Sequence, residues 1–456
     1  MERKEDIGRM HLAGITIDFE YGELWRGLHR SNPLSFKRPF SFIVYKDRDV
    51  YMAEDWRGRI RYEDDDASEV ISGTISSINY GKILLEVGVY ELSEPIDLTG
   101  KHNIVLEGEH YGVVRLDGSY RYGTVLYLKD GVNDDIIKKD ESTADRYGIV
   151  IRNLLLYGNR DNQTSGRGVY IRNCKETVLE NLQIWNCYGW GIELRDSEVS
   201  WIRNCEVREC GAGINIISTN VKAIGCDIGR TYTSHCLYIG SVKNVKLVKC
   251  NAYLSQLTGI YVDGGEEIDI IGCSAWSNDQ YGCRIRSARN VRVIGGDYKN
   301  NSQESAGSYA GILIEDSEYV RVMGVSAFDD QATATQGYGI REYGTSDNNV
   351  IAYCTVYGNS TAQIERVGSS TIVRRNIGYR TVNSGVATFS GDGSTTEFRI
   401  EHGLVSTPSK YGVSPLTPDA HADKTITVDS TYIIITFSTA PPSGTDNLKF
   451  GWWAEV

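Results

Sequence analysis

The sequence predicts an all-β fold in which short coils of chain stack on one another, and three observations support this. A phrase of the form Gly-apolar-any-apolar recurs at intervals of 22–29 residues, from GVYI at Gly168 to GIRE at Gly339. A second, β-branched phrase follows each copy, as in VSWIRNCEV and VKLVKCNA. The chain also contains 48 glycines and 29 tyrosines but only 8 prolines, which suits many short strands joined by tight turns.

Both phrases alternate with a period of two residues, and neither shows a helical stripe. A unit of this size, with about three short strands, cannot bury its own apolar side chains, so we expect the copies to stack as the coils of a solenoid. Equivalent residues should then form columns with a spacing of about 4.8 Å. The prediction places five cysteines in one inward column, interrupted by Gly296 and Val325: Cys205, Cys226, Cys250, Cys273 and Cys354.

The ten cysteines follow no CxxC or Cys/His zinc spacing, and all fall between Cys174 and Cys354. A small apolar thiol packs well in a repeated inward position. We therefore expect most of the cysteines to be buried free thiols rather than disulfides.

Over residues 66–384 the repeat resembles the single-stranded right-handed parallel β-helix of the pectate-lyase-like superfamily. A leucine-rich repeat of similar period is excluded because the LxxLxLxxN phrase is missing. The resemblance implies a parallel β-helix with three short strands per coil. It does not fix an activity, since one fold hosts many functions.

The predicted solenoid is preceded by a short amphipathic helix. From Asp66, the segment DASEVISGTISSI carries Val70, Ile71 and Ile75 on one helical face behind an aspartate N-cap. Together with the strand that follows, it resembles the cap at the N-terminal end of the β-helix in phage tailspikes. Residues 1–65 form an N-terminal extension, in which residues 43–62 are expected to be extended.

The repeat ends near Val382, and residues 385–456 show a different pattern. Turn signals at Gly391-Asp-Gly and Pro441-Pro-Ser-Gly separate alternating strands. We expect a small antiparallel β-domain here, similar to C-terminal modules of viral and phage surface proteins. Such a domain could bind, trimerise or cover the open lower edge of the solenoid.

Several classes of function are disfavoured by the composition. The net charge of −12 argues against a nucleic-acid partner, because phosphate binding needs a basic face. No apolar run approaches the roughly 18 residues of a membrane span, and the first residues show no signal peptide. Phosphate-binding, dinucleotide-binding, GxSxG and HExxH motifs are missing.

The outward columns of the predicted strands are rich in aromatic residues. Flat rings beside polar groups suit a polysaccharide, because the rings cover apolar sugar faces while carboxylates and amides bind hydroxyls. Two alternatives remain: aromatic residues favour strands generally, and they also occur at oligomer interfaces. The candidate substrate-binding residues are Trp185, Tyr238, Tyr253, Tyr261, Trp276 and Phe328.

Paired carboxylates suggest a catalytic role. Glu206 and Asp227 should lie on adjacent coils, roughly one strand spacing apart. A carboxyl separation of about 5 Å is typical of a retaining glycosidase and one of about 6.5–9.5 Å of an inverting glycosidase. A shared site would raise the pKa of one of them. The alternative is a solvated surface whose charge is balanced by Arg208. Asp279 is a further candidate because long turns near it, at 299–310 and 329–338, could wall a cleft.

One segment resembles a known enzyme family more closely. The residues from Ser234 to Ser241, SHCLYIGS, are similar to the GHGISIGS segment of polygalacturonases, and Arg284-Ile-Arg286 to their RIK segment. The resemblance adds His235 and Arg284 as candidate catalytic residues bordering a cleft. The aspartate motifs of that family are missing on the preceding coils, so polygalacturonase chemistry itself is not predicted.

We therefore expect a tailspike-type protein that binds a cell-surface polysaccharide and cleaves it as a hydrolase or lyase, on a virion surface or outside the cell. A lyase would imply Ca²⁺; no other cofactor or metal site is expected. The alternatives are a non-catalytic adhesin or structural spike and a pectinase-like secreted enzyme. The spike-like layout also predicts a homotrimer.

Overall fold

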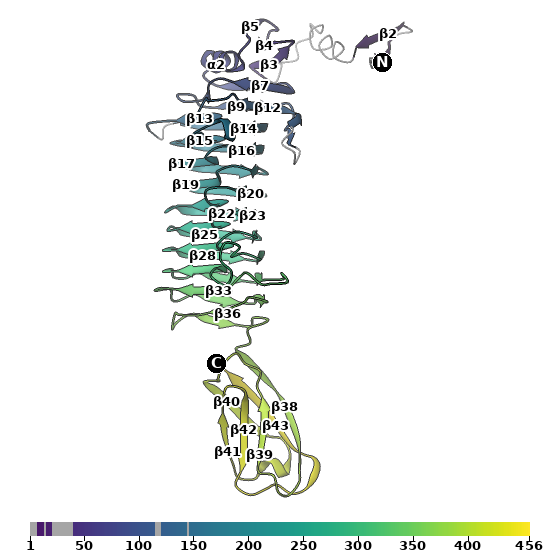
Figure 1. Cartoon of the computed structure of the whole chain (residues 1–456), viewed down its shortest axis with the longest axis vertical. Helices are drawn as coiled ribbons and strands as arrows, with labels where there is room; N and C mark the ends of the chain where they lie inside the picture. The colour runs from purple at the N-terminus through teal and green to yellow at the C-terminus, as the bar shows by residue number, and fades with distance from the viewer. Residues whose placement is uncertain (1–6, 13–14, 21–39, 115–119, 144–145) are drawn as a thin grey trace.

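The structure, a computed structural model, describes residues 7–12, 15–20, 40–114, 120–143 and 146–456. Figure 1 shows a long solenoid of stacked coils, with helix α2 (Ala67–Ser77) at its N-terminal end and a separate β-domain beyond its C-terminal end. The all-β prediction is confirmed: strands run parallel from coil to coil through the solenoid. No helix in the described ranges combines the length and apolar character of a membrane span.

The N-terminal end is closed by α2 (Ala67–Ser77), as the sequence predicts. The Asp66 carboxylate accepts a hydrogen bond of 2.8 Å from the Ser68 amide and so satisfies a free N–H of the first turn. The buried side of the helix, which includes Val70 and Ile71, joins the solenoid core. The cap thereby covers apolar side chains that the first coil would otherwise expose.

Three antiparallel strands precede this helix: β3 (Phe42–Asp47), β4 (Val50–Asp55) and β5 (Ile60–Asp64). The expected extended segment at 43–62 is thus confirmed. β3 also pairs in parallel with the first solenoid strand, β6 (Gly81–Leu85), so the strands join the cap to the coils. Further upstream, β1 (Ile7–Leu12) and β2 (Ile15–Glu20) form an antiparallel pair.

Each coil contributes to three parallel sheets, which we call faces A, B and C. Face A contains β7 (Gly88–Leu92), β12 (Thr124–Leu128), the ends of β14 (Arg146–Tyr157) and β16 (Cys174–Trp185), β18 (Glu206–Arg208), β20 (Asp227–Thr231), β23 (Asn251–Ser255), β26 (Ser274–Trp276), β29 (Asp297–Lys299), β32 (Ser326–Phe328) and β35 (Thr355–Tyr357).

Face B contains β8 (Ile96–Asp97), β13 (Ile137–Asp140), β15 (Val169–Arg172), the starts of β17 (Trp190–Arg203) and β19 (Ala212–Ile224), β21 (Leu237–Ile239), β24 (Ile260–Asp263), β27 (Cys283–Arg286), β30 (Ala310–Glu315), β33 (Tyr338–Tyr343) and β36 (Ala362–Glu365).

Face C contains β6, β9 (Ile104–Gly108), the starts of β14 and β16, the ends of β17 and β19, β22 (Lys243–Val248), β25 (Glu266–Ile271), β28 (Arg289–Ile294), β31 (Arg321–Met323), β34 (Val350–Ala352) and β37 (Ile372–Arg374). Two short elements leave the coils: the hairpin of β10 (Val113–Val114) and β11 (Tyr120–Tyr122), and the 3₁₀ turn η1 (Arg160–Asn162).

The interior is a continuous column of aliphatic side chains and thiols. All ten cysteines are free and buried, as predicted. The predicted column also exists: the Cys250 amide donates to Cys273 Sγ on the next coil at 3.4 Å. A buried polar ladder runs along the corner between faces A and B, where the Asn278 side chain donates to Asn301 and the Asn301 side chain donates to Gln336.

The corner between faces C and A turns through one residue with left-handed backbone. Asn204 has φ 50° and Lys249 has φ 52°, and Gly225 and Gly272 occupy the same corner in neighbouring coils. Asparagine and glycine tolerate this conformation best. The corner explains why Asn or Gly so often precedes the inward cysteine.

The C-terminal β-domain consists of two antiparallel three-stranded sheets around a core that includes Phe398, Ile435 and Phe450. One sheet contains β38 (Val382–Gly391), β43 (Gly444–Glu455) and β40 (Lys410–Pro415), and the other contains β39 (Glu397–Glu401), β42 (Tyr432–Phe437) and β41 (Lys424–Val428). The 3₁₀ turn η2 (Pro418–His421) connects them.

Lys249→Gly is predicted to stabilise the chain. A side chain on a left-handed residue costs about 1–2 kcal/mol, and replacing the exposed Lys249 by glycine removes this cost. The greater entropy of glycine in the unfolded chain offsets about 0.5–1 kcal/mol of the gain. Gly272→Ala, at the same corner with φ 60°, should destabilise by about 1 kcal/mol. Thermal unfolding followed by circular dichroism measures both, and equal melting temperatures for the two variants would contradict this account of the corner.

Candidate functional site

The predicted site residues fall on two adjacent faces of the solenoid. On face A, Glu206 pairs in register with Asp227, and Tyr253 with Trp276. On face B, Tyr238 pairs with Tyr261, which pairs with Arg284. The predicted columns are therefore confirmed as neighbours. The structure brings these residues together as two clusters, one on each face.

The face A cluster is centred on Arg208, and we call Glu206, Arg208, Asp227, Asn251 and Tyr253 the carboxylate cluster. The Arg208 guanidinium bridges the two acids: its Nε lies 2.5 Å from Glu206 Oε1 and its Nη2 lies 2.7 Å from Asp227 Oδ2. The Asp227 carboxylate also accepts from the Asn251 amide at 3.1 Å and from the Tyr253 hydroxyl at 3.0 Å.

The two acids occupy unlike environments. Burial raises the pKa of the Glu206 carboxyl; the positive charge of Arg208 opposes this rise, and the negative charge of Asp227 adds to it. Asp227, by contrast, accepts from three donors. The raised pKa favours the protonated form of Glu206, whereas the Asp227 carboxylate is held in place by its three hydrogen bonds.

A glycine shapes the cluster. Gly229 occupies the coil between Arg208 and Tyr253 in the same outward column. A Cβ at Gly229 would lie 2.4 Å from Tyr253 Cε2. The missing side chain lets the tyrosine ring lean toward the preceding coil, where its hydroxyl reaches Asp227.

Aromatic rings lie on both sides of the carboxylate cluster along face A. Toward the C-terminal coils, Trp276 stacks on Tyr253 of the cluster with ring centroids 4.7 Å apart and planes 7° apart, and Phe328 stacks on Tyr357 at 4.8 Å and 11°. Stacking covers one face of each ring, so a ligand can contact only the ring edges and the uncovered outer face of each stacked pair. Toward the N-terminal coils, Trp185 is only 7% exposed and packs on Val125 and Leu155, so it is less accessible than the outward column implied.

The face B cluster surrounds His235, and we call Trp190, His235, Tyr238, Tyr261 and Arg284 the histidine cluster. The His235 ring lies 4.9 Å from the Tyr261 ring and 5.9 Å from the Tyr238 ring, measured between centroids. Tyr261 is only 5% exposed, and the Arg284 guanidinium lies 5.1 Å from its ring centroid. The ring centroids of Trp190 and Tyr238 lie 6.3 Å apart.

His235 is neutral at ordinary pH. Burial, together with the positive charge of Arg284, lowers the pKa of His235 to about 4. Its Nδ1 accepts a hydrogen bond of 3.2 Å from the Thr258 amide, which assigns the proton of the neutral ring to Nε2. Burial and the Asp263 charge raise the pKa of Tyr238 to about 12, so that hydroxyl stays protonated.

The cations of face B are already paired. Arg284 donates twice to Glu315 Oε2, at 2.9 and 2.7 Å, and Arg286 lies 3.3 Å from Asp263. Tyr238 also donates to Asp263 at 3.2 Å. Asp263, Arg286 and Glu315 are register neighbours on consecutive coils of face B, and each already has an ion-pair partner within the protein.

Two residues of this face are not among the predicted site residues. Asn215 lies in the same outward column as Tyr238, is only 5% exposed, and has an Oδ1 without a partner among the described residues. Trp190 lies just before the glycine of the repeated phrase. The position in the column could have identified Asn215, whereas Trp190 falls outside the alternation used to assign outward side chains.

Asp279 lies apart from both clusters. It borders a hollow of about 540 Å³ at the corner between faces A and B, together with Arg230, Gln256 and Gln303. Burial and the nearby charge of Glu304 raise the pKa of Asp279. Within the described ranges, no group of three or more His, Cys, Asp or Glu side chains is arranged to hold a metal ion.

Gly229→Ala is predicted to disrupt the carboxylate cluster without unfolding the coil. The new methyl group would displace the Tyr253 ring, breaking its bond to Asp227 and its stack on Trp276. Near-ultraviolet circular dichroism of the Tyr253–Trp276 pair should change. Gly240→Ala is the matched control, because its Cβ would meet nothing closer than 3.5 Å; identical spectra for the two variants would contradict this geometry.

Comparisons with known proteins agree with the coil geometry. A family model described as "Right handed beta helix region" matches residues 99–232 and 212–377, together more than half of the chain. No curated protein matches the sequence.

Solved structures resemble the chain at low sequence identity. The A-module of mannuronan C-5 epimerase AlgE6 from Azotobacter vinelandii aligns with a TM-score of 0.51 and 16% identity, covering 68% of this chain and 95% of that one. DFA-IIIase from Arthrobacter chlorophenolicus A6 aligns with a TM-score of 0.52 and 11% identity, covering 68% and 90%.

The enzymatically active domain of tailspike protein 2 from bacteriophage CBA120 aligns over 100% of this chain and 73% of its own, with a TM-score of 0.54 and 10% identity. At such identities these likenesses show the fold alone. The family match, by contrast, spans the coils whose register is described above: the chain belongs to the right-handed β-helix family.

Proposed function

We propose that this chain binds a polysaccharide along its solenoid and hydrolyses it at the carboxylate cluster. One observation supports this most: Glu206 and Asp227 are register neighbours on face A in unlike environments, with the pKa of Glu206 raised and Asp227 held by three donors. The tailspike, epimerase and DFA-IIIase neighbours are consistent with a carbohydrate ligand.

The chemistry follows from these two environments. Protonated Glu206 donates its proton to the glycosidic oxygen as the bond to the anomeric carbon breaks, and the Asp227 carboxylate attacks that carbon. A water then replaces Asp227, and its proton returns to Glu206. Adjacent strands lie about 4.8 Å apart, which suits the short carboxyl separation of a retaining mechanism.

Arg208 has two roles in this proposal. It holds both carboxyls in place, and its positive charge limits how far the pKa of Glu206 rises. The bridge also supports the alternative of a purely structural ion network, in which the chain is a non-catalytic adhesin or spike. Catalysis therefore has to be tested separately from binding.

A lyase is a second candidate function, and the neutral state of His235 favours it. A neutral imidazole accepts the C5 proton of a uronate through its unprotonated nitrogen, here Nδ1, so the Thr258 amide would have to release that nitrogen; the protonated Tyr238 can donate to the leaving oxygen. The pairing of Arg284 with Glu315 and of Arg286 with Asp263 leaves less positive charge for the substrate carboxylate. We therefore place this reaction second.

Glu206→Gln and Asp227→Asn are each predicted to reduce polysaccharide cleavage by at least about 100-fold, the usual contribution of acid–base groups. Binding should change little, because the rings and Arg208 remain. Wild-type kcat should fall as pH rises through the elevated pKa of Glu206, since the donor then loses its proton. Reducing-end release measures cleavage and calorimetry measures binding; unchanged turnover in both variants would exclude this pair.

His235→Ala is predicted to leave cleavage within about threefold of wild type if hydrolysis occurs on face A. An unsaturated product, detected by its ultraviolet absorbance, and its loss in the His235 variant would instead establish the lyase. The two reactions are thus separated by the product as well as by the variant.

We also propose a virion-surface or extracellular location and a homotrimer. The full-length alignment with a phage tailspike supports the location. The layout of a solenoid followed by a small β-domain supports the assembly. Sedimentation velocity at micromolar concentration should show a trimer, and a monomer alone would defeat this part of the proposal.

A further inference from the structure

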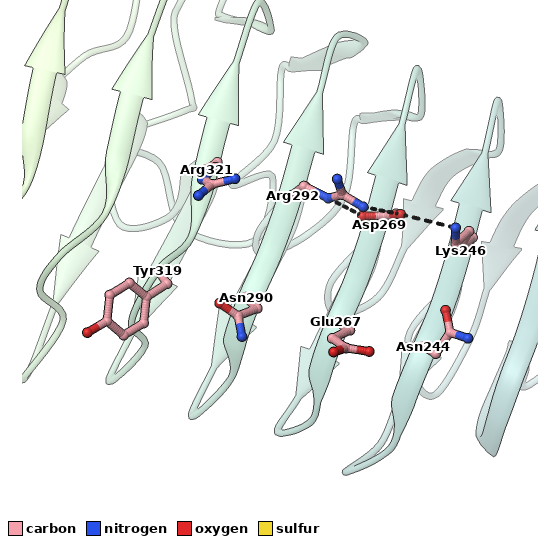
Figure 2. A pocket seen from close by; sticks show the side chains of 8 residues that line it. All are labelled: Asn244, Lys246, Glu267, Asp269, Asn290, Arg292, Tyr319 and Arg321. Carbon is pink, nitrogen blue, oxygen red and sulfur yellow. Dashed lines mark hydrogen bonds and ion pairs between the residues drawn. The ribbon is translucent and has the colours of Figure 1, made fainter.

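Face C carries a row of basic residues that neither cluster uses. Five register neighbours on consecutive coils form this row, which we call the basic row: Lys222, Lys246, Asp269, Arg292 and Arg321. Figure 2 shows the last four side by side along the coils. Four of the five are cations in a chain whose net charge is −12.

Asp269 organises the centre of the row. It is only 3% exposed, and it receives two hydrogen bonds from Arg292, at 2.6 and 2.8 Å. Lys246 approaches it from the other side at 3.8 Å. The buried carboxylate therefore fixes the head groups of its two neighbours and compensates part of their charge.

The ends of the row are not compensated. Lys222 lies directly beside Lys246, and Arg321 directly beside Arg292, one strand spacing apart. Neither Lys222 nor Arg321 has an ion-pair partner among the described residues. Like charges in direct register destabilise a sheet, so these positions retain a cost that a bound anion would remove.

A second row runs parallel to the basic row and offers hydrogen-bonding groups. It consists of Asn244, Glu267, Asn290 and Tyr319, which together with Lys246, Asp269, Arg292 and Arg321 line an open hollow of about 330 Å³. Each of the four has left-handed backbone at the corner leading into face C. Their amide, carboxylate and hydroxyl groups can bind sugar hydroxyls.

We propose that face C binds an acidic polysaccharide, whose carboxylate or sulfate groups lie on the basic row and whose hydroxyls contact the parallel row. This inference rests on the proposed function for its ligand class, a polysaccharide, and adds that the polymer is anionic and that a second, non-catalytic site holds it. The site would keep the polymer on the rod while face A acts on it.

The linear arrangement favours a polymer over a small anion. The basic row extends over consecutive coils with a repeat of about 4.8 Å, so it presents charges along a line rather than around a point. Because the ends are exposed, binding should weaken as salt screens the ion pairs. A neutral polysaccharide gains nothing from the uncompensated cations.

The test measures binding of polygalacturonate and alginate, with neutral pullulan as control, by calorimetry in a Glu206→Gln background. Arg321→Glu and, independently, Lys222→Glu should weaken binding of at least one of the acidic polymers about fivefold or more, the effect of losing an exposed ion pair and gaining repulsion. Lys449→Glu in the C-terminal β-domain is the matched control, with the same change of charge.

The outcomes separate the two proposals. Unchanged affinity for both acidic polymers in both basic-row variants, or no binding of either polymer by the parent protein, overturns the inference. Equal weakening by Lys449→Glu also overturns it, because the effect is then one of net charge. If the basic-row variants lose binding while the Glu206→Gln variant still cleaves the polysaccharide as fast as the wild type, the face C proposal is supported and the face A proposal is excluded.

Discussion

The structure depends on one constraint, the stacking of coils in register at the spacing of one β-strand. Register turns positions in the sequence into columns in space, so one kind of residue repeated at one position becomes a continuous line. The inward columns are filled by aliphatic side chains, thiols and the Asn278–Asn301–Gln336 ladder. The outward columns are free to vary, and the features of functional interest lie there.

The left-handed corners make this register possible. A single residue such as Asn204 or Lys249 turns the chain from face C to face A without a loop, so the coil length stays nearly constant. Where the turn is longer, as between faces A and B, the chain places Asp279 and the residues around it at the edge of a hollow. Regular corners thus keep the columns aligned, whereas longer turns change the shape of the surface where two faces meet.

The three faces differ chemically even though they share one backbone. Face A combines two acids, one arginine and aromatic rings; face B surrounds a neutral histidine with rings and satisfied ion pairs; face C presents cations in a row. In each case the spacing of the backbone sets which charges meet. Arg208 can bridge Glu206 and Asp227 only because Asp227 lies on the coil next to the strand that carries both Glu206 and Arg208.

The sequence predicted the fold well because repetition reports stacking directly: the cysteine column, the cap helix after Asp66 and the pairing of Glu206 with Asp227 all follow from periodicity. It predicted less about the sites. The burial of Trp185 arises from packing on Val125 and Leu155 of earlier coils, which carry no copy of the phrase. The neutral state of His235 depends on its burial and on the charge of Arg284, and the role of Gly229 depends on the tilt of the Tyr253 ring toward the preceding coil. None of these three features can be predicted from the pattern of residues in the sequence.

We propose that a polysaccharide is cleaved on face A, at the carboxylate cluster. The most direct measurement is a crystal structure of the Glu206→Gln, Asp227→Asn double variant with a bound oligosaccharide. The account predicts a glycosidic oxygen within hydrogen-bonding distance of the residue 206 side chain, with sugars over the Tyr253–Trp276 stack. An oligosaccharide seated instead at the histidine cluster of face B, with face A empty, would contradict it.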